Sequence, residues 1–136
     1  MKRTRDAVGL LVIAATAIGV LGGSPSTAQA HNVTFRSIVV IDGHYQTTGG
    51  PLTGAVYSFD TCKCRGARLV TVWERNPGAM DAPVGTAKTN RAGRWRLDVT
   101  APAGIYYATV EKKAILRKGG HRHVCSYDRS SNFSVP

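Results

Sequence analysis

After its first thirty residues, the 136-residue sequence has no long apolar run, no heptad and no helical periodicity. These absences exclude coiled coils and helical bundles, which need apolar residues at spacings of three and four. Glycine and proline instead recur roughly every ten residues, a spacing typical of short strands joined by turns. We therefore expect an all-β fold.

Acidic residues are scarce, with eight Asp and Glu against 18 Lys and Arg. Residues 31–136 hold seven of these acids, and no two of them form an evident pair for acid–base catalysis. No serine stands in a G-x-S-x-G motif or another nucleophile context. The sequence predicts neither an enzyme nor a cofactor.

Residues 1–30 have the features of a secretory signal peptide. A basic start precedes 17 apolar, uncharged residues at 7–23, and Ala28-Gln29-Ala30 fits the small-residue cleavage rule. The alternative is an uncleaved anchor, because 17 apolar residues are at the low edge of a membrane span. We expect cleavage after Ala30, one domain at residues 31–136 without a transmembrane span, and a secreted, periplasmic or cell-envelope location.

Residues 31–136 are strongly basic. They carry 15 Lys and Arg against seven acids, a formal charge of +8. Such a charge favours anionic polymers or cell-envelope surfaces as partners. The candidate anion-binding residues surround one expected hairpin: Lys112, Lys113, Arg117, Lys118 and Arg122. No aromatic residues are interleaved there, so no specific nucleic-acid motif is present, and a merely solvated hairpin is the alternative.

Residues 84–110 form the stretch around which we expect the fold to be organised. Three alternating runs there are separated by turns at residues 90–93 and 101–104, which predicts an antiparallel meander of three strands. Further strands are expected at residues 35–41, 52–59, 67–74, 121–127 and 133–135. The predicted core comprises Val70, Val72, Trp95, Leu97, Val99, Tyr106, Ala108 and Val110. Seven or eight short antiparallel strands in about 100 residues indicate a single immunoglobulin-like sandwich.

Trp73 is expected on the face opposite Val70 and Val72. An exposed tryptophan on a sheet can stack a sugar ring, whereas a covered one packs under a loop or against a second apolar layer. The covered role is the one we expect, and sugar stacking is the alternative.

Three cysteines remain after the signal segment: Cys62, Cys64 and Cys125. Export favours disulfide bonding, and an odd count leaves one thiol. Cys62 and Cys64 are too close in one extended segment to pair easily, so either of them is expected to bond Cys125.

A metal centre is a second hypothesis for this region. His121, His123 and Cys125 alternate, so they share one side of a strand, and if Cys64 bonds Cys125, Cys62 is expected near His123. A thiolate with imidazoles is a reasonable start for a copper or zinc site. The candidate ligands are His31, Cys62, His121 and His123. The alternative is that these histidines are solvated.

The order of several short motifs resembles small exported transthyretin-like domains, also called carboxypeptidase-regulatory-like, which have a prealbumin-type sandwich. The matching residues are Gly54, Val56, Ser58, Cys64, Arg68, Val70, Val72, Gly85, Ala87, Thr89, Gly93, Arg94, Trp95, Gly104, Tyr106, Tyr107, Ala108, Val110, Cys125 and Ser130. The resemblance implies a Cys64–Cys125 disulfide, and it leaves Cys62 unexplained.

Together these features predict an exported, non-catalytic binding or envelope-structural module that contacts anionic surfaces or polymers through its basic hairpin. The alternative function is that of an exported copper- or zinc-binding protein.

Overall fold

The computed structural model describes residues 32–42, 49–116 and 122–136, and they form an all-β protein. The elements are β1 (Asn32–Phe35), β2 (Ile38–Ile41), β3 (Leu52–Tyr57), the short 3-10 turn η2 (Cys62–Cys64), β4 (Leu69–Glu74), β5 (Ala82–Lys88), β6 (Arg94–Leu97), β7 (Gly104–Val110), β8 (Lys113–Leu116), β9 (Arg122–Cys125), β10 (Asp128–Arg129) and β11 (Phe133–Val135). Within these ranges no helix is long and apolar enough to cross a membrane. The expected all-β class is confirmed.

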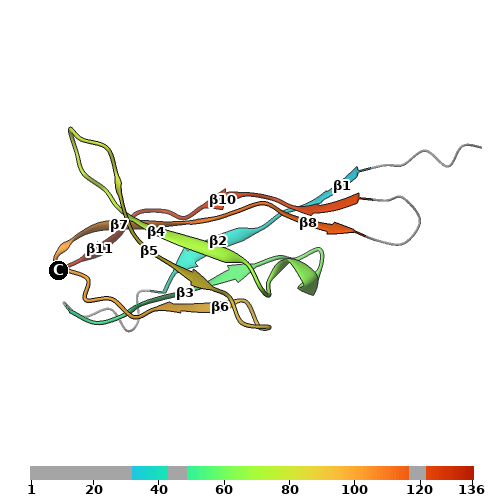
Figure 1. Ribbon diagram of the computed structural model, residues 1–136, viewed down its shortest axis with the longest axis horizontal. Helices are drawn as coiled ribbons and strands as arrows, with labels where there is room; N and C mark the ends of the chain where they lie inside the picture. The colour runs from blue at the N-terminus through green and yellow to red at the C-terminus, as the bar shows by residue number, and fades with distance from the viewer. Residues whose placement is uncertain (1–31, 43–48, 117–121) are drawn as a thin grey trace, which may run out of the picture.

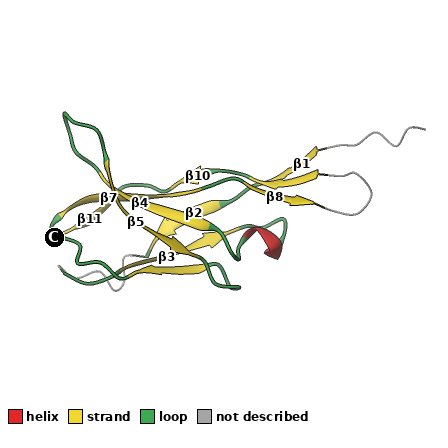
Figure 2. Ribbon diagram, in the orientation of Figure 1, coloured by secondary structure: helices red, strands yellow, loops and turns green. Residues whose placement is uncertain are grey.

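The strands form three sheets (Figures 1 and 2). Sheet A has the order β1-β9-β8, and sheet B has the order β2-β3-β6. Sheet C has the order β10-β7-β4-β5, with β11 also paired to β7. Every pairing is antiparallel except that of β1 with β9, which is parallel. The described part of the chain thus has eleven strands in three sheets, and a single sandwich of seven or eight antiparallel strands, as expected from the sequence, is not shown.

The hydrophobic core gathers the inward faces of sheets B and C. Sheet B contributes Val39, Leu52, Val56, Trp95 and Leu97, and sheet C contributes Val70, Val72, Tyr106, Ala108, Val110 and Val135. The Trp95 indole, 3% exposed, lies so close above Gly54 that a Cβ at that position would overlap the ring. The predicted core is confirmed, with Val99 packed against it as a partly buried member.

The predicted meander at residues 84–110 is wrong, although its strands exist. β5 and β7 lie on either side of β4 in sheet C, while β6 pairs with β3 in sheet B. The turn at residues 90–93, with Gly93 at φ +87°, therefore carries the chain from one sheet to the other. Local alternation fixes which face of a strand is buried, but it does not fix the partner.

Sheet A extends beyond the other two sheets at one end of the molecule (Figure 1). Three chain segments cross between it and the rest: β1 to β2, β7 to β8, and β9 to β10. The segment from β1 to β2 interrupts the single strand expected at residues 35–41. At this break the Ser37 backbone amide donates to the Ser126 hydroxyl (2.9 Å). We call the region where the three segments cross the junction.

Candidate functional site

The basic hairpin is described only in part. Arg117 and Lys118 lie outside the described residues. The Lys113 ammonium donates to the Gly66 carbonyl (3.0 Å), while Lys112 and Arg122 are exposed. Lys113 pairs with Cys125, three residues from Arg122, so alternation puts these two side chains on opposite faces of sheet A. The cations described here thus do not share one face.

Of the predicted metal ligands, His31 and His121 lie outside the described residues. Cys62 belongs to a 3-10 turn, and not to the extended segment that the sequence suggested. His123 is half-buried, with its ring edge-on to Phe35 at a centroid distance of 5.1 Å. Among the residues that the structure describes, no three His, Cys, Asp or Glu side chains lie close enough together to hold a metal ion. The metal centre stays a prediction.

The Cys64–Cys125 disulfide is confirmed, and both cysteines are fully buried. It joins η2 to the end of β9, so it ties sheet A to the segment that leads into β4. A disulfide is typical of proteins that fold in an oxidising setting.

Beside the disulfide lies a buried arginine for which the sequence analysis predicted no role. Arg68 is only 1% exposed, and its terminal nitrogens donate to the Ser37 hydroxyl (2.9 Å) and to three carbonyls, those of Cys64 (2.8 Å), Glu111 and Ser126 (2.9 Å). Burial lowers the pKa of its guanidinium, which nevertheless stays charged because an arginine does not deprotonate in a protein. Ser37, Glu111 and Ser126 lie on the three segments that cross at the junction, so this one side chain holds all of them.

The face of sheet C that points away from the core has a second cluster, built from two cross-strand rows. Trp73 of β4 and Tyr107 of β7 are direct partners, and their rings are nearly parallel (11°) with centroids 6.3 Å apart. The Trp73 indole nitrogen donates to the Thr109 hydroxyl (3.0 Å). The adjacent row comprises Thr86, Thr71, Thr109 and Arg129. We call these two rows, with Asp81, the outer aromatic face.

Tyr107 is the centre of the outer aromatic face. Its hydroxyl donates to one oxygen of the Asp81 carboxylate (2.8 Å), whose other oxygen accepts from the Asn76 amide (3.2 Å). The Arg129 guanidinium lies 3.9 Å from the centroid of the Tyr107 ring. The hydrogen bond from Tyr107 lowers the pKa of Asp81, while burial and then that same bond raise the pKa of Tyr107. These contacts hold the ring in one position.

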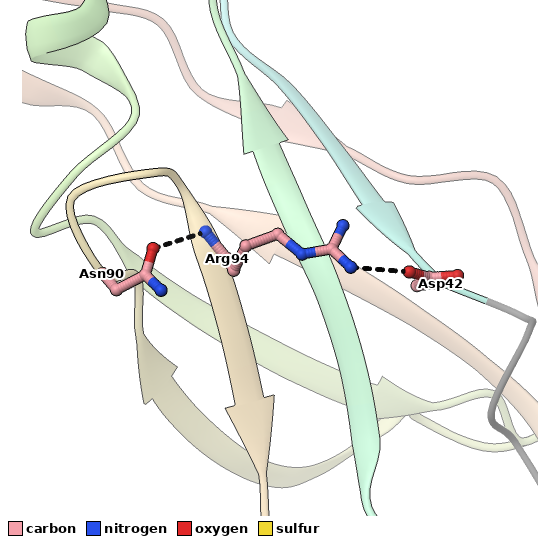
Figure 3. A network of polar contacts seen from close by, with 3 residues as sticks. All are labelled: Asp42, Asn90 and Arg94. Atoms are coloured by element: carbon pink, nitrogen blue, oxygen red, sulfur yellow. Dashed lines mark hydrogen bonds and ion pairs between the residues drawn. The ribbon is translucent and has the colours of Figure 1, made fainter.

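The outward face of sheet B has a different character. Arg94 reaches across β3 to Asp42 (3.0 Å), and the amide of the same arginine donates to the Asn90 side chain (3.0 Å; Figure 3). Arg96 pairs with Asp98 (2.6 Å). The cations of β6 are therefore matched by acids. No pocket is found among the described residues.

No family model, no curated protein and no solved structure matches the chain.

Proposed function

We propose that the protein is an exported, non-catalytic module that binds an anionic polymer or surface of the cell envelope. The observation that carries this proposal is the excess of cations: the described ranges hold thirteen Lys and Arg and seven Asp and Glu. Within those ranges the structure has two ion pairs, both on β6. Unneutralised surface cations attract polyanions and speed their encounter with the protein.

Several of these cations surround the junction. Arg36, Lys63 and Lys112 are exposed, and each is next in sequence to a residue that accepts a hydrogen bond from Arg68. Because one guanidinium reaches all three neighbours, the three cations lie in one region of the surface. The acids of that region are Asp60, which accepts from the Arg36 amide, and Glu111. Arg117 and Lys118, which lie outside the described residues, stay a predicted part of the anion-binding set.

The disulfide supports export, because it fits the signal peptide expected at residues 1–30. We also propose that the protein is related to the transthyretin-like domains that its sequence resembles. The Cys64–Cys125 disulfide is the feature of the structure that agrees with this resemblance.

We predict that the protein is retained on a sulfated, heparin-like resin and that retention falls steeply with salt, because binding releases counterions. Replacing Lys112, Lys113, Arg117 and Lys118 by alanine should remove most of the retention. The double variant Arg36→Gln/Lys112→Gln tests the junction cations and should also elute at lower salt than the wild type.

The matched control is Arg94→Gln/Arg96→Gln, which removes the same charge from the ion-paired face of sheet B. It should shift elution less than Arg36→Gln/Lys112→Gln. Equal shifts in the two double variants would mean that only net charge matters, and unchanged retention of the quadruple variant would exclude the hairpin. A wild-type protein that is not retained at low salt would end the proposal.

A further inference from the structure

Two aromatic side chains on the outward side of sheet C keep part of their surface exposed. Asp128 points inward, where its carboxylate accepts from the Val39 amide (2.8 Å). Strand alternation therefore puts Tyr127 and Arg129 on the outward side, together with Tyr107. Tyr127 is 54% exposed, and Trp73 is half-buried. Three aromatic side chains thus lie on one side of neighbouring strands.

Cations accompany these rings. Arg129 lies over the Tyr107 ring, and Arg75 follows Trp73 by two residues, so it extends to the same side of β4. Lys88 is exposed on the edge strand β5. The nearest acid, Asp81, already accepts hydrogen bonds with both carboxylate oxygens. Glu111 lies at the end of the face toward the junction. Three cations against Asp81 and Glu111 leave this region with a small net positive charge, and Arg129 and Arg75 also interact electrostatically with Asp81.

Two of the three rings are also fixed before any ligand arrives. Trp73 is held through Thr109, and Tyr107 is held through Asp81 and Arg129. Side chains that are already ordered lose little conformational entropy when a ligand binds. The threonines of the adjacent row place hydroxyl groups next to the rings.

We propose that the outer aromatic face binds the sugar rings of an acidic polysaccharide. This inference rests on the proposed function, and it names the class of polymer. The apolar side of a sugar ring packs against aromatic surface, its hydroxyls match those of Thr71 and Thr86, and its carboxylate or sulfate groups pair with Arg129 and Arg75. The Thr109 hydroxyl is already engaged by Trp73 and the Thr71 carbonyl. Because Tyr107 is only 9% exposed, the aromatic surface open to a ligand is that of Trp73 and Tyr127.

The test uses an oligomer of a uronic acid, a linear polyphosphate of equal charge and an oligo(dT) of equal charge. The chain has two tryptophans, and Trp95 is buried, so acrylamide quenching of fluorescence reports mainly on Trp73. We expect the oligouronate to protect Trp73 from acrylamide and the polyphosphate not to protect it. Equal protection by the polyphosphate or by oligo(dT) would overturn the assignment to sugar.

Calorimetric titration of variants with the oligouronate completes the test. Trp73→Ala should weaken binding by about tenfold or more, as loss of a stacking ring does, and Trp73→Phe should restore part of it. Arg129→Gln should reduce the slope of log affinity against log salt by about one. The matched control is Tyr57→Ala, which removes an aromatic side chain, 43% exposed, from the outward side of sheet B.

Unchanged affinity in both Trp73 variants would refute the inference. If the wild type is retained on the sulfated resin but no oligouronate protects Trp73, this inference fails while the proposed function stands. If the wild type is not retained at all, the proposed function itself fails.

Discussion

Of the side chains described above, Arg68 is the one whose replacement should destabilise the largest part of the fold. We predict that Arg68→Met lowers the free energy of unfolding by about 2 to 5 kcal/mol. Four hydrogen bonds from its terminal nitrogens would be lost, and they reach the disulfide segment and all three segments that cross at the junction. Methionine keeps much of the side-chain length but leaves the four oxygens without this donor.

The magnitude follows from two opposing terms. A hydrogen bond from a charged donor contributes about 1.5 to 3 kcal/mol, so four of them contribute roughly 6 to 12 kcal/mol. Keeping a cation buried costs several kcal/mol, and no carboxylate accepts from Arg68 to offset that cost. The lowered pKa of the guanidinium has this same cause, burial. The difference between the hydrogen-bond contribution and the cost of burying the cation is a large fraction of the total stability of a domain, which is about 5 to 15 kcal/mol.

The assay is urea unfolding followed by circular dichroism, combined with amide hydrogen exchange. Because Arg68 holds sheet A to the rest, amides of β8 and β9 should exchange faster in Arg68→Met by a larger factor than amides of β4 and β7. Arg65→Met is the matched control, since Arg65 is half-buried and donates two hydrogen bonds to one acceptor, the Ser58 carbonyl (3.1 and 3.0 Å), so its loss should cost less than that of Arg68.

An unfolding free energy of Arg68→Met within about 0.5 kcal/mol of the wild type would refute this reasoning. Exchange that accelerates equally in all three sheets would contradict the assignment of Arg68 to the junction.

Two further predictions concern the disulfide and Asp81. The variant Cys64→Ala/Cys125→Ala should lose about 4 kcal/mol of stability, because the bond closes a loop across 61 residues; urea midpoints measure this, and an unchanged midpoint would contradict it. Tyr107→Phe should raise the pKa of Asp81 toward its ordinary value, as carboxyl NMR titration would show. Because the Asp81 pKa is lowered in the folded state, its contribution to stability is present above about pH 4 and is lost as pH falls through the folded pKa. Stability of Tyr107→Phe should therefore fall less on acidification, and identical acid dependence would contradict this.

The sequence predicted those features that depend on neighbouring residues. Alternation in β6 predicted that Trp95 and Leu97 are buried, and the same rule placed Trp73 on the opposite face from Val72. The disulfide partner of Cys125 followed from the resemblance, and the structure agrees with it. Each of these inferences needed only a local pattern or a short motif.

Features that depend on distant segments were not predictable. No residue near positions 94–97 specifies β3 as the partner strand of β6. If β6 had paired with β5 instead, its inward side chains could have been buried equally well. The break at Ser37 depends on the Ser126 hydroxyl, 89 residues away in sequence. Asp81 was likewise missed, since its bond to Tyr107 spans 26 residues and no motif marks it.

The two arginines at the centre of these clusters show why residue type alone could not locate a binding surface. Arg68 is buried with its terminal nitrogens engaged by oxygens of the chain, whereas Arg129 lies at the surface over an aromatic ring. A guanidinium whose terminal nitrogens are used internally has little left for a ligand, so the polymer binding that we propose would depend on the exposed cations. In the proposed function Arg68 would act indirectly, because it holds the segments that carry Arg36 and Lys112 and so sets the spacing of these two cations.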